Sequence, residues 1–241
     1  MKSYKARGIV LHTVRYGDSS LIVYLLTDLL GRQTYLVQGV RSARSKGNKA
    51  ALFQPMFVVE FEGVESPHAQ MHRMREVRNA FPLAALAFDV RKSTISLFMA
   101  EVLYKLVREV EPNSPLFDFV CRSVVALNQT ERGTANFHLW FLVQLSFHLG
   151  FFPGNEYREG SFFDIREGLF LPHTNSDSPI FSAANSRLLG QFMHTEAQEI
   201  DSIALSRRDR SDFLNSLLSY FGYHLDSMHG IRSIDILKEV F

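Results

Sequence analysis

The sequence predicts an α+β protein in which a small antiparallel barrel precedes a helical domain. Short segments rich in β-branched residues, separated by turn signals, occupy residues 1–80. From about residue 83 onward the apolar residues instead recur every three or four positions, which is typical of amphipathic helices. The chain has 241 residues, 46% of them apolar, and is long enough for one large domain or two modest ones.

Five strands are expected in the N-terminal part. The first ends at the turn signal Tyr16-Gly17-Asp18, and the third places Tyr35 and Val37 on one side. The expected strands span residues 6–16, 20–27, 33–40, 53–61 and 70–80. A closed barrel of such strands has no exposed edge, and the OB-fold is the five-stranded barrel that commonly binds single-stranded nucleic acid. The pattern alone leaves an SH3-like barrel open as an alternative.

Helical spacing dominates the rest of the chain. Pro112 ends the first long helix, and Asn113 or Ser114 can cap the next one, with Pro115 in its first turn. The expected helices span residues 90–110, 114–127, 134–149, 183–194 and 210–225, with a short one near the C-terminus. The helix at 134–149 is apolar nearly all round, which predicts that it lies at the buried centre of a helical domain.

A small hairpin is expected before the fourth of these helices. The segment FFDIREGLF, residues 162–170, turns near Glu167-Gly168. The expected organisation is therefore a barrel domain at residues 1–80 and a helical domain at residues 81–241, the latter with a cysteine-free insertion around residues 151–180.

The net charge of +1 conceals an asymmetry along the chain. Residues 1–50 contain nine Lys and Arg against Asp18 and Asp28, a balance of +7. Three more basic and four more acidic side chains bring residues 1–80 to +6, so the remaining 161 residues carry −5. A basic barrel joined to a mildly acidic remainder indicates that the barrel meets a polyanion.

The stretch Gly31–Pro55 contains the densest group of these cations. Two expected strands flank a loop in which basic residues alternate with Ser, Gly and Asn, a composition that suits phosphate contacts. A solvated loop is the plain alternative, but further cations accumulate elsewhere in the barrel, and Arg73 and Arg75 are expected on one strand face. The predicted DNA-binding residues are Lys5, Arg7, Arg15, Arg32, Arg41, Arg44, Lys46, Lys49, Arg73 and Arg75.

Aromatic residues of the barrel are a second kind of candidate. Tyr4, Tyr16 and Tyr35 could stack on bases, because stacking tolerates any base. Each of them is more often part of a barrel core or rim.

No catalytic or metal site is expected. The sequence contains no Walker A loop, no GxGxxG after a strand, no GxSxG and no HExxH. The single cysteine, Cys121, excludes an intramolecular disulfide and a cysteine zinc cluster, and its apolar helix favours a buried side chain over a nucleophile. His68 and His72 lie four apart without further ligands at a recognisable spacing. No cofactor is expected.

Several stretches resemble the bacterial recombination mediator family RecO over essentially the full length of the chain. They are ARGIVLHTVRYGDSSLIVYLLTDLLGRQTYLVQGVRSARSK, LFQPMFVVEF, HLGFFP and IRSIDIL. The G-x-R-S-x-x-S loop at residues 39–45, followed by Leu52-Phe53-Gln54-Pro55, is the most specific of these signals, and the C-terminal half is matched more weakly.

The resemblance implies that the barrel at residues 1–80 is an OB-fold DNA-binding domain and that the C-terminal domain is helical. It also implies a non-enzymatic function in DNA repair and homologous recombination. It implies binding of single- and double-stranded DNA, annealing of complementary strands, contact with single-strand binding protein, and partnership with RecR to load RecA. It also implies a cytoplasmic, nucleoid-associated location, and neither a leader nor an apolar run of the roughly 18 residues that a membrane span needs is found in the sequence.

Two features depart from the family pattern. Some relatives carry a four-cysteine zinc module after the LGF-P motif, whereas residues 155–177 here contain no cysteine, so zinc is not expected and Phe162, Phe163 and Phe170 are expected to hold the hairpin. The helix at 134–149 has few charges, with Arg132 just before it, which leaves the site of contact with single-strand binding protein open. An RNA-binding OB module and a non-catalytic adaptor for an acidic protein surface remain alternatives.

Overall fold

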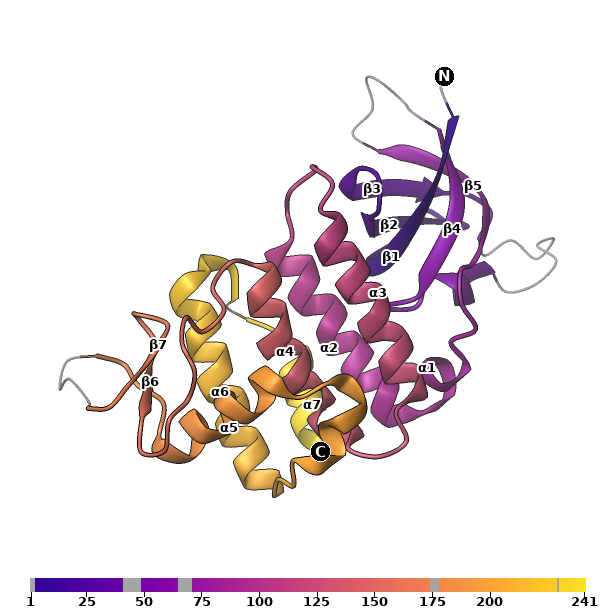
Figure 1. Cartoon of the computed structure of the whole chain (residues 1–241). Helices are drawn as coiled ribbons and strands as arrows, with labels where there is room; N and C mark the ends of the chain where they lie inside the picture. The colour runs from indigo at the N-terminus through magenta and orange to yellow at the C-terminus, as the bar shows by residue number, and fades with distance from the viewer. Residues whose placement is uncertain (1–2, 41–48, 65–70, 174–177, 229) are drawn as a thin grey trace. The chain divides into compact units, whose positions relative to one another are not determined.

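The computed structural model describes residues 3–40, 49–64, 71–173, 178–228 and 230–241. The chain forms two compact units, Met1–Gln129 and Thr130–Phe241, and each is described on its own (Figure 1). The first unit holds the barrel and three helices, and the second holds the remaining helices and a hairpin. The predicted domain boundary at residues 80 and 81 stays a prediction, since compactness groups the first three helices with the barrel.

The N-terminal barrel is an OB-fold, as predicted. Its five strands close in the order β1-β2-β3-β5-β4, and only β3 and β5 pair in parallel (Figure 1). The strands are β1 Ser3–Tyr16, β2 Ser20–Thr27, β3 Gly31–Val37, β4 Val58–Val64 and β5 His72–Asn79. The inward positions are apolar at alternating residues, such as Val23 and Leu25 on β2 and Phe61 on β4, all buried. This closure leaves the outward positions of the strands for contacts with helices or ligands.

The fourth strand begins later than predicted. Residues Lys49–Phe53 form a 3₁₀ helix, η1, and β4 starts at Val58, so the expected strand at 53–61 is wrong in its first part. Met56 has a positive φ of 66°, which a continuous strand does not allow. Its N–H donates to the Val10 carbonyl, which turns the chain onto β1 before β4 begins.

Three helices complete the first unit: α1 Ala84–Phe88, α2 Val90–Leu106 and α3 Ser114–Gln129. α1 was not predicted. The Asp89 carboxylate caps α2 by accepting from the N–H groups of Arg91 and Lys92, and the Asn113 side chain caps α3 by accepting from the Leu116 N–H.

The first long helix is shorter than predicted. α2 ends at Leu106 instead of residue 110, because the chain that follows lies along β3, where the Arg32 N–H donates to the Glu109 carbonyl. Gly31 permits this approach: its φ is +61°, and a Cβ there would collide with the backbone of Val110 and Glu111.

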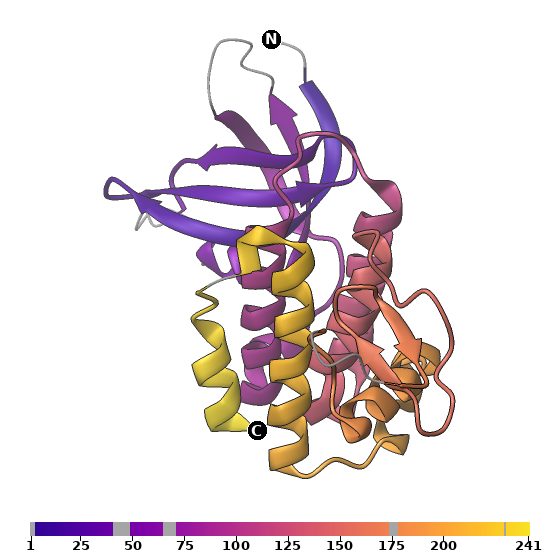
Figure 2. The ribbon, with the colours of Figure 1, turned by 90° about the vertical axis from the view of Figure 1, so that its left-hand side faces the viewer.

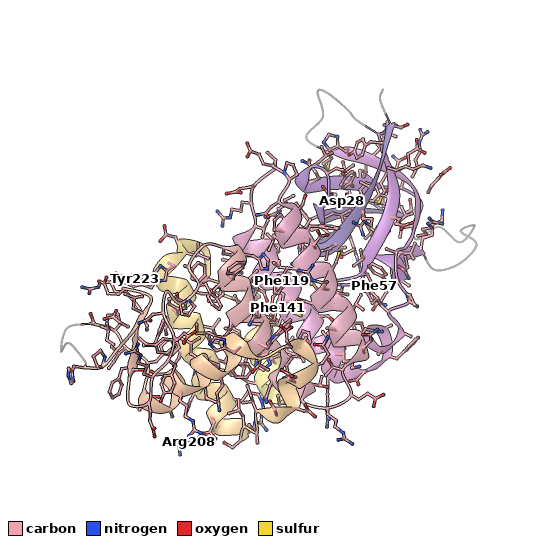
Figure 3. The ribbon with its side chains drawn as sticks, viewed as in Figure 1. Asp28, Phe57, Phe119, Phe141, Arg208 and Tyr223 are labelled. Carbon is pink, nitrogen blue, oxygen red and sulfur yellow. The ribbon has the colours of Figure 1, made fainter. Side chains whose placement is uncertain are left out.

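The second unit is built around α4 Phe137–His148, whose residues are buried nearly all round, as predicted. Phe141, at its middle, is fully buried (Figure 3). α7 lies beside α6, where the Lys238 ammonium donates to the Asn215 side chain (Figure 2). The other elements are η2 Thr134–Asn136, β6 Phe162–Asp164, β7 Leu169–Leu171, α5 Ala183–His194, η3 Ala197–Ser202, α6 Arg207–His224, η4 Asp226–Met228 and α7 Ser233–Val240.

The hairpin of β6 and β7 is present where the sequence predicts it, and two polar side chains fix its backbone. Asn155 accepts from the Phe170 N–H and donates to the Phe170 carbonyl, at 2.6 and 2.9 Å. The buried Asp164 carboxylate accepts from the N–H groups of Arg166 and Glu167 at the turn. The hydrogen bonds that these two side chains form with the backbone therefore position the cysteine-free insertion.

Aromatic packing completes the hairpin. The Phe163 ring lies 5.1 Å from those of Phe170 and Phe181 and 5.0 Å from that of Tyr220 on α6. Phe163 and Phe170 thus have the packing role that the sequence predicts for them, while Phe162 is half-buried.

Candidate nucleic-acid interface

Part of the predicted basic loop lies outside the described residues. Arg41, Arg44 and Lys46 belong to that part, whereas Lys49 opens η1 and is exposed. The flanks of the loop are anchored, because the Val40 and Phe53 side chains are buried. The described residues on both sides of the loop are therefore part of the core of the first unit.

The cations of β5 point outward. Arg73 and Arg75 are exposed on either side of the buried Met74, so they share a strand face, as the alternation predicts. Leu36 of β3 pairs with Arg73, and Glu62 of β4 pairs with Arg75. Arg73 also pairs with Val64 of β4 and thus lies between β3 and β4, whereas Arg75 lies beside β4.

A bulge in β5 brings Arg78 into phase with Arg75. A three-residue spacing would place the two side chains on opposite faces of a regular strand. Here the register shifts between Glu60 and Glu62, and Glu76 has a φ of +51°, so two residues of β5 oppose one of β4. Arg78 consequently pairs with Glu60, and its Nη2 lies 2.6 Å from the Glu60 carboxylate.

The outer face of β1, β4 and β5 is balanced in charge. Two cross-strand rows each place a carboxylate of β4 between two cations: Lys5, Glu62 and Arg75 in one row, and Arg7, Glu60 and Arg78 in the other. A hollow of about 520 Å³ on this face is lined by three cations and four carboxylates, namely Lys5, Arg7, Arg78, Asp28, Glu60, Glu62 and Glu76. The carboxylates offset the attraction that the cations exert on phosphates.

Arg7 has partners inside the first unit. Its Nε lies 3.4 Å from the Asp28 carboxylate, and its backbone N–H donates to the same side chain at 3.0 Å (Figure 3). Its guanidinium also lies 5.4 Å from the centroid of the Phe117 ring on α3. The contact with Phe117 joins the barrel to α3, whereas those with Asp28 stay within the barrel.

Arg32 joins the barrel to the end of α2. Its Nη1 donates to the carbonyls of Tyr104 and Val107, at 2.8 and 3.0 Å. Its guanidinium lies 4.2 Å from the Tyr104 ring centroid and 5.5 Å from that of Tyr24. A cation that satisfies the last carbonyls of a helix is favoured by the helix dipole, so this arrangement serves the fold whether or not it meets a ligand.

The outer face of β1, β2 and β3 differs from the balanced face. Many of its residues are apolar or aromatic, with His12, Val14 and Tyr16 on β1 paired with Tyr24, Ile22 and Ser20 on β2. Ser20, Thr34 and Arg32 are the polar or charged residues at its outward positions on β2 and β3. Val14 is 41% and Tyr16 52% exposed, and His12 is exposed as well. One cross-strand row runs from Val14 through Ile22 and Leu36 to Arg73. This face is the one that OB-folds commonly offer to oligonucleotides.

The tyrosines considered as stacking residues occupy different environments. Tyr35 is fully buried in the barrel, and its hydroxyl lies 2.9 Å from that of Tyr4. Burial raises the pKa of Tyr35 above its usual value, with a further contribution from the Tyr4 hydroxyl. Tyr35 is therefore core, whereas Tyr16 is accessible to a base.

Sequence reasoning missed His12, Tyr24 and Tyr104 as surface aromatic residues. The alternation of β2 could have placed Tyr24 outward, opposite to Val23 and Leu25. Nothing in the sequence points to Tyr104, because it reaches the sheet from a helix many residues away.

The cysteine considered as a nucleophile is buried. Cys121 lies in α3, and burial raises the pKa of its thiol to about 12, so the thiol is protonated at neutral pH.

No metal site is found among the described residues, because no three of their His, Cys, Asp or Glu side chains lie close enough together to hold an ion. His68 is not one of the described residues. Within the same residues, no helix combines the length and apolar character needed to cross a bilayer.

Comparison with known proteins gives consistent matches along the whole chain. The family model for the recombination protein O N terminal matches residues 1–81, and the model for the recombination protein O C terminal matches residues 87–232. DNA repair protein RecO of Phocaeicola vulgatus is 35% identical over 238 residues, and that of Bacteroides fragilis strain ATCC 25285 is 36% identical over 241 residues. The protein of the same name from Flavobacterium psychrophilum is 32% identical over 237 residues. Each alignment covers 98% of both chains.

Proposed function

The chain belongs to the RecO family of DNA repair proteins, and we propose that it acts as a non-enzymatic mediator of recombinational repair. In this proposal it binds single- and double-stranded DNA and anneals complementary strands. It contacts single-strand binding protein and, together with RecR, helps to load RecA. The cytoplasm, at the nucleoid, is the proposed location.

The observation that carries the DNA-binding part of the proposal is a basic OB-fold with an open apolar face. Residues 1–80 have a net charge of +6, while the other 161 residues have −5. Apolar and aromatic side chains occupy much of the outer face of β1 to β3, beside the polar Ser20 and Thr34, and Arg73 lies at the edge of that face. Bases and phosphates of one strand would find both kinds of partner on this side of the barrel.

The predicted DNA-binding residues fall into two groups by their surroundings. Arg15, Lys49 and Arg73 are exposed and form no ion pair with any residue that the structure describes. Together with Arg41, Arg44 and Lys46 of the basic loop, they are the proposed phosphate contacts.

The second group has competing partners. Arg7 and Arg32 bind other side chains and carbonyls of the first unit. Lys5 and Arg75 flank Glu62. We propose that these four cations contribute less to DNA affinity than the first group, because their charge is partly offset or is used within the fold.

Annealing follows from the same contacts. Two single strands repel each other through their phosphates, and cations on one surface lower that repulsion so that complementary bases can meet. No bond is made or broken by the protein in this step, so no catalytic side chain is needed.

A strand-annealing assay tests the proposal. Complementary oligonucleotides coated with the cognate single-strand binding protein are mixed with the chain, and duplex formation is followed by fluorescence. We expect wild type to accelerate annealing and the triple variant Arg41→Ala, Arg44→Ala, Lys46→Ala to lose most of that acceleration.

The matched control removes three exposed arginines of the second unit, with Arg166→Ala, Arg187→Ala and Arg208→Ala. It should anneal naked strands as wild type does. Equal annealing by the loop triple and wild type would contradict the proposed role of the loop. Tighter binding of a matched RNA than of the DNA would favour an RNA-binding module, and failure of any oligonucleotide to bind would favour the adaptor.

A further inference from the structure

The outer face of the barrel carries a cluster of three rings and one guanidinium, formed by His12, Tyr24, Arg32 and Tyr104 and called here the ring cluster. His12 and Tyr24 pair across β1 and β2, and their ring centroids are 5.9 Å apart. The Tyr104 ring, from α2, lies 4.7 Å from that of His12 and 5.2 Å from that of Tyr24. Residues from two strands and a helix thus meet at one place on the surface.

The ring cluster is held rigidly. Arg32 is fixed by its hydrogen bonds to two carbonyls at the end of α2, and its guanidinium lies over the Tyr104 ring. Tyr24 meets the Tyr104 ring edge to face. Fixed rings lose little conformational entropy when a ligand binds to them, which favours binding.

The ring cluster is also accessible. His12 is exposed, and Tyr24 and Tyr104 are half-buried. On the same face of β1, Val14 and Tyr16 continue the apolar surface to the turn between β1 and β2. Rings that served only to attach α2 to the barrel would not require an exposed imidazole at the open side of the cluster.

We propose that the ring cluster, with Val14 and Tyr16, is a stacking platform for unpaired bases of a single nucleic-acid strand. This inference rests on the proposed DNA-binding function and assigns a particular site to it. Aromatic rings bind bases of any sequence through their faces, which suits a protein that must act on arbitrary sequence. A duplex keeps its bases stacked on each other, so the platform acts on single strands.

A cation borders the platform where phosphates would pass. Arg73 ends the cross-strand row that begins at Val14. Arg15 is exposed at the rim of the barrel, but it pairs with the buried Leu21 and so alternates with Val14 and Tyr16 across β1. Partial burial and then the nearby Arg32 lower the pKa of His12 below its usual value, although the Glu101 carboxylate acts in the opposite direction. The imidazole is therefore a neutral ring at pH 7, and it contributes by stacking instead of by charge.

The test compares variants at His12, because its exposed side chain can be changed with little effect on the fold. Binding of a labelled single-stranded 20-mer is measured by fluorescence anisotropy. His12→Ala should weaken binding about 5- to 150-fold, the range expected for loss of one base–aromatic contact. His12→Phe should bind within about twofold of wild type, because it retains a ring. Leu29→Ala, which removes a side chain that is 49% exposed at another turn of the barrel, should have no effect.

An abasic 20-mer of equal charge separates base stacking from phosphate contact. Wild type and His12→Ala should bind it equally, and the salt dependence of DNA binding should be the same for both proteins. Two results would overturn the platform while leaving DNA binding intact: equal affinity of wild type and His12→Ala for the normal 20-mer, or an equal loss on the abasic one. Absence of binding by wild type would instead overturn the proposed function itself.

Discussion

The guanidinium of Arg32 lies over the ring of Tyr104 and also donates a hydrogen bond to the carbonyl of that residue, 2.8 Å away. One basic residue of the barrel thereby satisfies the end of a helix and fixes an aromatic side chain. In the sequence, Arg32 looks like any other member of a basic N-terminal region. Its partners show that the positive charge of Arg32 is used in contacts that stabilise the fold.

Replacing Arg32 by Lys should therefore destabilise the first unit. An ammonium cannot reproduce the guanidinium fork over the ring, and the loss of charge-assisted hydrogen bonds gives an expected cost of about 1–3 kcal/mol. Urea denaturation followed by circular dichroism measures this change. Arg15→Lys, at the exposed rim, is the control and should stay within about 0.5 kcal/mol of wild type. Equal midpoints for all three proteins would contradict the structural role of Arg32.

Replacing Glu76 by Gly should stabilise the barrel. Glu76 is exposed and has a φ of +51°, a conformation that costs an L-residue about 1–2 kcal/mol. Gly also increases the conformational entropy of the unfolded chain, which offsets part of the relieved strain. The free energy of unfolding should therefore rise by about 0.5–1 kcal/mol. Thermal denaturation should show a higher Tm.

Met56→Gly is the informative comparison for that prediction. Met56 also has a positive φ, but its side chain is fully buried. Loss of the buried side chain outweighs the relief of strain, and the expected net cost is about 1–3 kcal/mol. A fall in Tm for Glu76→Gly would show that the bulge is not strained at this residue.

The Asn155 side chain should be essential for the position of the hairpin in the second unit. Asn155→Ala removes both hydrogen bonds to Phe170, with an expected cost of about 1–3 kcal/mol. Hydrogen exchange at the Phe170 amide should accelerate, while exchange in α4 stays slow. Asn155→Asp keeps the acceptor for the Phe170 N–H and should retain more protection than the Ala variant. Unchanged exchange in Asn155→Ala would contradict this account of the insertion.

The second unit should lose stability in mild acid because of His138. Burial, with a contribution from Arg210, lowers the pKa of His138 to about 3, against 6.5 for the free side chain. Below pH 6.5 the unfolded chain binds a proton at this residue that the folded chain excludes. Above pH 6.5 both states hold His138 neutral, and its ionisation has no effect on the free energy of unfolding. As the pH falls from 6.5 toward 3, the free energy of unfolding decreases by up to about 1.4 kcal/mol per pH unit.

Chemical denaturation at pH 7 and pH 5 measures this effect. Other groups titrate in the same range, so the comparison is with His138→Leu, which should lose less stability between the two pH values than wild type. An equal loss in both proteins would contradict a depressed pKa at His138.

Local patterns allowed most of the fold to be predicted, because they report which side chains face a core. The alternation of β2 and the helical spacing of α5 gave the correct ranges, and the five strands indicated a small barrel. The choice of an OB-fold over an SH3-like barrel came from the family resemblance. The errors occur where tertiary contacts decide the backbone. Met56 turns onto β1 before β4 starts, and residues after Leu106 leave the helix to lie along β3.

The candidate site was less accessible to sequence reasoning. Charge identified the basic barrel, but it could not show that Arg7 and Arg32 have partners on α3 and at the end of α2. A bulge decides the face on which Arg78 lies, and alternation does not predict bulges. The rings around Tyr104 come together only through the packing of a helix on the barrel.

The salt dependence of single-strand binding tests the central claim most directly. Kd for a labelled oligonucleotide is measured between 50 and 200 mM salt for wild type, the loop triple variant and the three-arginine control. Each phosphate contact adds about 0.7 to the slope of log Kd against log salt for single strands. The loop triple should therefore bind more weakly and lose about 2 from the slope, whereas the control keeps the wild-type slope. Identical slopes and affinities for all three proteins would contradict the claim that this OB-fold holds DNA through its basic loop.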